Sequence, residues 1–470
     1  MPRSTFAKKA RRSTWRHCPA SRSAWTTSCN RKKRAKECVV KIGPVHVVKD
    51  ATMAWMQAAL HRFSSCLANS NQELERISQL LAETTDERDR LLRLVADANV
   101  QAHRLQHHPA FARLAPVWML EPDADDQRSR CAVERVAAAY RRAMAAQTMR
   151  DAGMWIHAER RNSAFIAALE SGNAKAVRNQ LASLFQSGLI NGLGRFHENM
   201  AVQIRASACT PIQLQFIDAL VSLAEAFGVA RVTSFEQDAK AHAHALDRDP
   251  DALLKRIEAR SQLRLDFPRI GGAYGCTAAG RHLAIDSLIH GYTVQRLREL
   301  ETRSDWRFVE IGGGYGCLAE LMHRHGFTNY AIYDLPWVNA IQGYFLILAL
   351  PEKSVQLFGE PPAELAVLPF WEFFDLPAQA ADMVINTDSL PEMGAAIAAS
   401  YIESIANVAR KFFFSINQEA KADVEAFGPQ QCVAEIVERT GGLRPVSRQR
   451  YWMRPGYVEE LFIPSGNSGS

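Results

Sequence analysis

The stretch RFVEIGGGYGC (307–317) decides the fold, because a short apolar run leads directly into an acidic residue and a glycine-rich turn. The run that ends at Ile311 is typical of a buried strand. Glu310 stands at its end, and Gly312, Gly314 and Gly316 follow at alternate positions. Glycines in such a turn let a ligand approach the backbone closely. We therefore expect a strand that ends in a ligand-binding loop.

Downstream of residue 306, short apolar runs alternate with longer helical patterns. This alternation predicts an α/β fold, a Rossmann-like, mostly parallel sheet with helices on both faces. Ligands of such sheets bind at the carboxyl ends of the strands. The predicted strands are Arg307–Ile311, Tyr330–Tyr333, Ser354–Phe358, Met383–Asn386 and Lys411–Ile416, and the predicted helices are Leu318–His325, Val338–Leu350 and Gly394–Ala409.

Composition divides the chain into four predicted segments. Residues 1–50 hold 14 Lys and Arg against 2 acids, so the net charge of +6 resides in a basic, disordered arm and the remainder is mildly acidic. The arm either contacts nucleic acid or anionic lipid, is a transit peptide, or precedes a true start at Met53. After it we expect a helix over 51–105, a helical domain over 106–300 and a catalytic domain over 301–465.

The helix over 51–105 has apolar residues at heptad spacing. Thr84 and Glu87 share the seam, so the frame is imperfect. Two alternatives stay open, a homo-oligomeric coiled coil and a helix packed on its own domain. The apolar seam positions are Ile77, Leu80, Leu91 and Leu94.

The segment 106–300 shows amphipathic helix patterns at Ala137–Met149, Ala174–Leu189 and Pro211–Phe227. A turn-rich loop with consecutive glycines interrupts it at 266–276. The sequence has no apolar run long enough to span a membrane. Its nine cysteines lack metal-binding spacing, which favours reduced thiols and a cytoplasmic location.

The predicted cofactor is S-adenosylmethionine, because Glu310 would repel a pyrophosphate and attract a ligand that carries sulfonium and ammonium groups. No Gly-Lys-Ser or Gly-Lys-Thr sequence follows the glycines, which excludes a phosphate-cradling P-loop. Asp334 ends the second predicted strand and can accept two hydrogen bonds from a ribose diol. Nicotinamide enzymes use the same device, and Asp334 before Leu-Pro also suits a helix cap.

Further segments resemble the sugar O-methyltransferase family. They lie at 270–276, 309–317, 333–346, 385–393, 415–419 and 454–462, and NTDSLPEM (386–393) is the most specific. The resemblance covers about residues 265–463. It implies a class I methyltransferase fold, a sugar hydroxyl as acceptor and a role in surface-glycan or related carbohydrate tailoring. Two other functions stay open, a nicotinamide-dependent oxidoreductase and a non-catalytic protein that binds nucleic acid through the basic arm.

A sugar hydroxyl is a poor nucleophile at neutral pH and needs a base or a metal. Asp388 or Glu392, after the fourth predicted strand, could act as the base, although both also suit helix capping. Together with Asn417 and Glu419 they could instead hold magnesium or calcium, which prefer oxygen ligands. We expect Asn386 to contact the cofactor, and Asn417 and Glu419 to contact the acceptor.

Two histidines follow the glycine loop at 270–276, and their spacing places them on one helix face. Either His282 or His290 could reach the acceptor as a base, and we favour His290. Tyr274, in the loop itself, could stack on a sugar ring. A purely structural role is the alternative for each of these three residues.

Overall fold

The structure, a computed structural model, describes residues 45–104, 114–148, 155–190, 196–232, 249–300, 302–420, 423–424 and 428–466. The chain forms two compact units, Met1–Val95 and Ala96–Ser470. Most of the predicted arm, residues 1–44, lies outside the described residues, and its last six residues are already helical.

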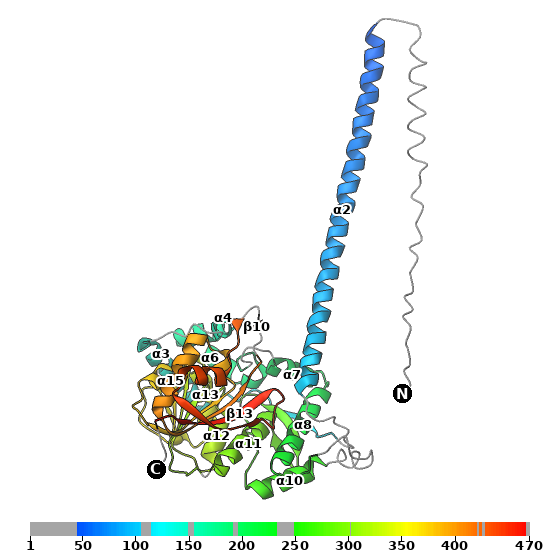
Figure 1. Ribbon diagram of the computed structural model, residues 1–470. Coiled ribbons are helices and arrows are strands. Elements are labelled where there is room, and N and C mark those ends of the chain that lie inside the picture. The colour runs from blue at the N-terminus through cyan, green and yellow to red at the C-terminus, as the bar shows by residue number, and fades with distance from the viewer. Residues whose placement is uncertain are drawn as a thin grey trace, which may run out of the picture. The chain divides into compact units, whose positions relative to one another are not determined.

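Helix α2 (Val45–Arg104) confirms the predicted helix and begins six residues earlier than expected (Figure 1). Its 60 residues make it about 90 Å long. In the part of the chain that the structure describes, no helix is long and apolar enough to cross a membrane.

The second unit is built around an eight-stranded sheet in the order β12-β13-β9-β8-β4-β5-β7-β6. Six of these strands pair in parallel, and β12 runs in the same direction, whereas β13 is antiparallel to both of its neighbours, β9 and β12. The strands are β4 (Phe308–Ile311), β5 (Tyr330–Asp334), β6 (Val355–Leu357), β7 (Leu365–Pro369), β8 (Ala381–Thr387), β9 (Ala409–Gln418), β12 (Leu443–Arg450) and β13 (Tyr457–Pro464). The predicted Rossmann-like sheet is therefore confirmed.

Helices cover both faces of this sheet (Figure 1). Alternate residues of β4 show why, because Val309 and Ile311 belong to one buried cluster and Phe308 to the other. Glu310 shares the face of Phe308. The first cluster packs under α14 (Trp371–Phe374), α15 (Ala395–Val408) and α16 (Val433–Thr440), and the second packs under α12 (Cys317–Arg324) and α13 (Pro336–Ala349).

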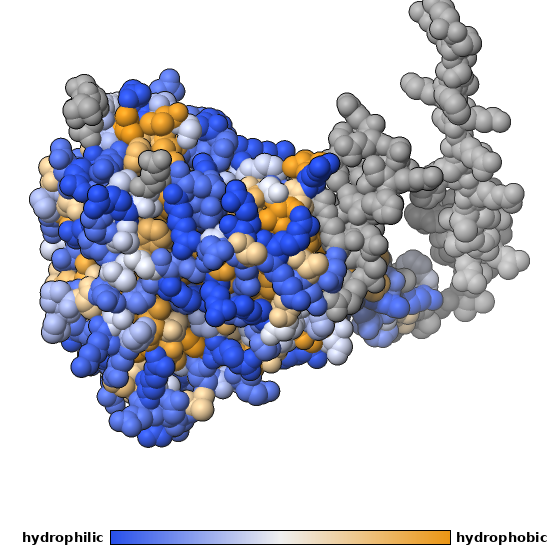
Figure 2. Space-filling view, turned by 90° about the horizontal axis from the view of Figure 1, so that it is seen from below, coloured by the Kyte–Doolittle hydropathy of each residue, from blue (hydrophilic) through white to orange (hydrophobic). Residues whose placement is uncertain are grey.

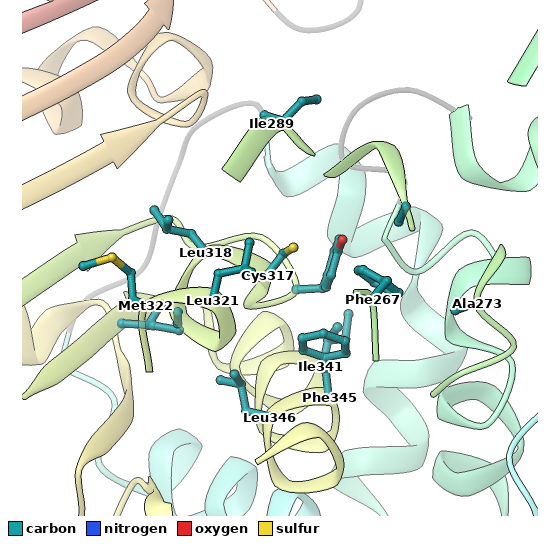
Figure 3. Packing of buried hydrophobic residues seen from close by; sticks show 14 of the residues in the cluster. Phe267, Ala273, Ile289, Cys317, Leu318, Leu321, Met322, Ile341, Phe345 and Leu346 are labelled. Carbon is teal, nitrogen blue, oxygen red and sulfur yellow. The ribbon is translucent and has the colours of Figure 1, made fainter. Parts of the chain in front are cut away.

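The region before the sheet is mainly helical, as predicted, and shares the second cluster with α12 and α13. Phe185 joins the two regions, because its ring centroid lies 4.9 Å from that of Tyr315 and 5.4 Å from that of Phe267. Figure 3 shows Phe267 close to Phe345 of α13 in this packing. The helices are α3 (Gln127–Ala145), α4 (Trp155–Arg161), α5 (Ser163–Glu170), α6 (Ala174–Leu181), α7 (Phe196–Arg205), α8 (Thr210–Ala226), α10 (Pro250–Ser261) and α11 (Ile285–Glu299).

The predicted loop at 266–276 contains a strand that the sequence analysis missed. A turn at Gly271 and Gly272 leads into β2 (Tyr274–Ala278), which pairs with β1 (Val117–Met119) and β3 (Arg281–Leu283). At Gly275 a side chain would collide with the backbone of Leu283 in the neighbouring strand. Close strand pairing, as well as turn formation, therefore explains the glycines of this segment.

On the face of the second unit shown in Figure 2, hydrophilic residues predominate and hydrophobic ones lie in small, separated patches. Among the described residues of this unit, the exposed large hydrophobic side chains are Met144, Val202, Val232 and Val446.

Candidate functional site

A pocket of about 560 Å³ opens at the carboxyl ends of the parallel strands. The loops after β4, β5 and β8 line it, together with residues of α7, α8 and α11. Strand β4 lies between β5 and β8, so the strand order reverses at this point. Open α/β sheets bind their ligands where the order reverses in this way.

The glycine loop forms the floor of the pocket. Gly312 has φ +70°, and a side chain there would collide with Ser389. Gly314 has φ +56° and would place a side chain in open space, where no heavy atom lies within 4 Å. Both line the pocket, whereas Gly316 begins α12 and lies outside the lining. The first two glycines therefore leave the backbone of the loop accessible from the pocket.

Glu310 lines the pocket from beneath the loop and is 1% exposed. The hydroxyl of Tyr330 donates a hydrogen bond of 3.0 Å to its carboxylate. Burial raises the pKa of Glu310 to about 8, and the neighbouring Asp334 also raises it. A cationic ligand would offset the cost of this buried charge.

Asp334 lies at the end of β5 and also lines the pocket. One carboxylate oxygen accepts the backbone N–H of Leu335 at 2.8 Å, and the other accepts the side-chain amide of Gln342 at 2.8 Å. The same amide donates to the carbonyl of Gly314 at 2.9 Å. Gln342 therefore holds Asp334 and the glycine loop together, a role that the sequence analysis missed.

Asn386, predicted to contact the cofactor, is fully buried and lies outside the pocket lining. Its side-chain amide donates to the carbonyl of Ile311 at 2.9 Å, and its oxygen accepts from Asn417 at 2.9 Å. Asn417, predicted to contact the acceptor, likewise lies outside the lining. These two side chains connect the ends of β4, β8 and β9 and support the loop that starts after β8.

Asp388 lies in that loop and lines the pocket. It has φ +59°, a conformation that non-glycine residues rarely adopt. The guanidinium of Arg454 lies 3.0 Å from its carboxylate, and the hydroxyl of Tyr457 donates to it at 2.9 Å. Both partners flank the start of β13 and line the pocket.

Glu392 also lines the pocket, and burial together with nearby Asp388 raises its pKa to about 8. Glu419 lies outside the lining, because it forms an ion pair of 2.7 Å with Arg448. The proposed oxygen ligands of a divalent cation are therefore not brought together. No group of three or more His, Cys, Asp or Glu among the described residues is placed to hold a metal ion.

Helix α11 contributes two titratable groups one turn apart. Asp286 accepts a hydrogen bond of 2.7 Å from the hydroxyl of Tyr315. Burial opposes its ionisation, but His197, His290 and the other polar neighbours outweigh this effect and lower its pKa. Nδ1 of His290 is buried and has no hydrogen-bond partner, and burial lowers the pKa of this imidazole to about 4.

The other residues predicted on this side have different positions. His282 lies on β3, where it contacts the ring of Trp118 and lies outside the pocket lining. Tyr274 is also outside the lining, with its hydroxyl 2.9 Å from Nδ1 of His197. His197 itself lines the pocket, and Tyr274 contacts it from outside the lining. Burial lowers the pKa of His197.

Neither a protein-family model nor a curated protein sequence matches this chain. Solved structures with a similar fold include magnesium protoporphyrin IX methyltransferase from Synechocystis PCC 6803, with 13% identity over 37% of this chain and 81% of that one, at a TM-score of 0.29. An S-adenosylmethionine-dependent methyltransferase from Mesorhizobium loti shows 12% identity over 37% of this chain and 97% of that one, at a TM-score of 0.27. The 1,6-didemethyltoxoflavin-N1-methyltransferase from Burkholderia thailandensis shows 14% identity over 36% of this chain and 74% of that one, at a TM-score of 0.25.

Because these TM-scores are below 0.5, the fold assignment rests on the sheet itself. Six parallel strands, with antiparallel β13 between β9 and β12, form a class I methyltransferase fold, as predicted. A fold alone does not define an activity, which depends on the residues of the pocket.

Proposed function

We propose that this protein is an S-adenosylmethionine-dependent O-methyltransferase that acts on a sugar hydroxyl, in surface-glycan or related carbohydrate tailoring. One observation carries the proposal. Two acidic side chains, Glu310 and Asp334, flank a glycine floor in a single pocket at the point where the strand order reverses. A ligand with a cationic centre and a ribose diol can interact favourably with both, the cation with Glu310 and the diol with Asp334.

The donor half of the pocket comprises Glu310, Asp334 and the loop from Gly312 to Gly314. With its pKa of about 8, Glu310 is largely protonated at pH 7 in the unliganded pocket, and a cationic ligand favours its ionised form. A pyrophosphate would oppose this ionisation, because it adds negative charge next to the carboxyl group. Asp334 is held by two hydrogen bonds from protein groups and can accept further ones from a diol. When bound here, S-adenosylmethionine supplies the methyl group.

The acceptor half combines aromatic surfaces with hydrogen-bonding groups. The rings of Trp155 and Trp337 line it and lie 6.3 Å apart between centroids. Asp218, His290 and Thr293 line it as well. Apolar walls with a few polar groups are typical of pockets for small ligands. Flat apolar ring faces and spaced hydroxyl groups of a sugar match this combination, and the resemblance of the 386–393 segment points to the same acceptor.

His290 is the group that we assign as base. With its pKa near 4 in the unliganded pocket, its imidazole is neutral at pH 7, and the unpartnered Nδ1 can accept a proton. Asp286, one turn earlier, remains ionised and stabilises the imidazolium that forms. The hydroxyl oxygen gains nucleophilicity as its proton moves to Nδ1.

The two carboxyl groups of the 386–393 segment have other roles in this proposal. Arg454 and Tyr457 already engage Asp388, which makes it a positioning group at the acceptor mouth. Glu392 is largely protonated at pH 7, because its pKa is about 8. It therefore donates a hydrogen bond to the acceptor and does not remove a proton.

Binding measurements test the donor half first. Calorimetric titration of the full chain should show binding of S-adenosylmethionine and S-adenosylhomocysteine, and no binding of NADH. NADH binding without S-adenosylmethionine binding would overturn the proposal in favour of an oxidoreductase.

Methyl transfer tests the acceptor half. With isotopically labelled S-adenosylmethionine, we expect label in glycosides, nucleotide sugars or glycans, and none in matched amine or thiol acceptors. Label in RNA or in an amine only would refute the sugar assignment.

His290→Gln tests the base. The loss of a general base typically costs about 10²–10⁴-fold in rate, so kcat should fall by that factor while the affinity for S-adenosylmethionine stays unchanged. The residual rate should rise with pH, because hydroxide can then remove the proton. His282→Gln is the matched control, since this histidine lies outside the pocket. Equal effects of both substitutions would remove His290 from the mechanism.

A further inference from the structure

Helix α2 carries a long exposed apolar stripe. Its members recur at alternating spacings of three and four residues, which is the heptad pattern of a coiled coil. The a positions are Met53, Leu60, Leu67, Leu74 and Leu81, and the d positions include Met56, Phe63 and Ile77. This frame differs from the predicted one, because Leu80 now stands beside the seam at position g.

The stripe needs a partner. Its side chains are between 46% exposed at Met56 and 71% exposed at Phe63. Burying one such side chain contributes about 1.5–3 kcal/mol. The first unit has no second helix or strand within its described residues, 45–95, that could cover the stripe.

The period of the stripe selects another helix as the partner. A strict heptad drifts by about 20° per repeat around a straight helix. From Met53 to Leu81 the drift reaches about 80° over four repeats. A globular surface cannot follow a turning line of this kind, whereas a second helix that winds around the first can.

The length of the stripe is matched by a second copy of the same helix. From Met53 to Leu81 the stripe spans about 42 Å of helix. A second copy of α2 carries the same stripe over the same length and therefore matches it by identity.

The polar seam positions favour a parallel arrangement. Ser70 and Thr84 occupy d positions and Arg88 an a position. In a parallel, in-register pair each of these polar layers meets its own copy, and Arg88 lies beside Glu87 of the second copy at position g. An antiparallel pair centred on the stripe would instead place Ser70 against the apolar layers near Leu60 and Leu67.

We propose that α2 forms a parallel, two-stranded coiled coil with the α2 of a second copy of this chain, so that the protein is a homodimer. This inference is independent of the proposed activity. Light scattering on the full chain should give the mass of two chains. A monomer or a trimer would overturn the proposal.

Disulfide trapping tests register and direction. In a full chain that carries Cys66→Ser, Ser70→Cys at a d position should form a covalent dimer under mild oxidation, because facing d positions lie within disulfide reach. Ser65→Cys, on the outer f position of the same helix, is the matched control and should form none. A dimer by mass that Ser70→Cys fails to trap would overturn the parallel register.

Charge insertion tests the seam. Leu67→Glu with Leu74→Glu should convert the dimer to a monomer, because two like charges would then face each other in consecutive a layers. Ser65→Glu with Gln72→Glu adds the same charge at f positions and should leave the dimer intact. Binding of S-adenosylhomocysteine by each variant reports that the second unit is folded. Dimers in both double variants would overturn the proposed seam.

Discussion

Glu310→Gln removes the buried carboxylate while keeping its shape. Burial raises the pKa of Glu310 from 4.5 to about 8. Each pKa unit corresponds to about 1.4 kcal/mol, so the ionised carboxylate destabilises the unliganded fold by about 5 kcal/mol once the pH exceeds 8. The variant lacks this cost at every pH.

The sign of the pH dependence follows from the raised pKa. The neutral carboxyl stabilises the fold fully below pH 4.5, and this contribution is lost as the pH rises through 8. The variant and the wild type should therefore unfold at the same temperature near pH 4.5. By pH 8 the variant should unfold about 5–10 °C higher, at about 2 °C per kcal/mol.

Ligand binding should show the opposite trend. A cationic ligand lowers the pKa of Glu310, so binding to the wild type releases a proton and tightens by up to about tenfold per pH unit below pH 8. Glu310→Gln should bind S-adenosylmethionine more weakly and lose this pH dependence. Calorimetry at pH 6, 7 and 8 and thermal unfolding with and without the ligand measure both effects.

Glu392→Gln is the matched control, because burial and Asp388 raise the pKa of Glu392 to about 8 as well. It should show the same gain in unfolding temperature while keeping its affinity for S-adenosylmethionine. A Glu310→Gln variant that binds the ligand with unchanged affinity and pH profile would refute the assigned role of Glu310.

Three further outcomes are expected. Gln342→Leu should weaken S-adenosylmethionine binding about tenfold, because Asp334 and the glycine loop both lose a hydrogen bond worth about 1 kcal/mol; unchanged affinity in a titration would contradict this. Asp388→Asn should raise the KM for the acceptor and leave S-adenosylmethionine binding unchanged in the same titration. Gly312→Ala should lower the free energy of unfolding by about 2–3 kcal/mol in denaturant unfolding, because of its positive φ and its collision with Ser389. Gly326→Ala, where φ is +89° and no heavy atom lies within 4 Å, should lower it by only about 1 kcal/mol.

The fold was largely predictable because local patterns encode it. All five predicted strands correspond to strands of the sheet, including the one before the glycine loop. Strand β12 was missed because only its first residue, Leu443, is buried, so its sequence has no apolar period. Strand β7 (Leu365–Pro369) is a short apolar run between two turns. It was missed because the predicted strand Ser354–Phe358 comes shortly before it.

The two acidic residues of the pocket were recognisable for the same reason. Glu310 and Asp334 each lie at the carboxyl end of a recognisable strand in one short stretch of chain, and both line the pocket. Gln342 was not predictable as a positioning residue, because it lies in an apolar helix and its partners are fixed only by packing.

The acceptor half depends on contacts between distant segments. Asp388 meets Tyr457, which is 69 residues later in the chain, and no local spacing predicts this pairing. Asn386 and Asn417 appeared to be ligand-binding residues because polar side chains at strand ends usually face a ligand. They instead bond to each other, as buried polar groups must when no water is near. The position of Glu419 follows from Arg448 on the neighbouring hairpin.

The single amide of Gln342 has a consequence for selectivity. It fixes Asp334 and the carbonyl of Gly314 at the same time, so the two ends of the donor half are set in one rigid frame during folding. A rigid frame lowers the entropy lost on binding, and only a molecule that reaches both ends collects the full benefit. Adenosine alone and methionine alone should therefore each bind with much less than half of the binding free energy of S-adenosylmethionine. A substitution of Gln342 therefore alters the positions of both Asp334 and Gly314. It cannot change the binding of the ribose end without also changing the glycine loop.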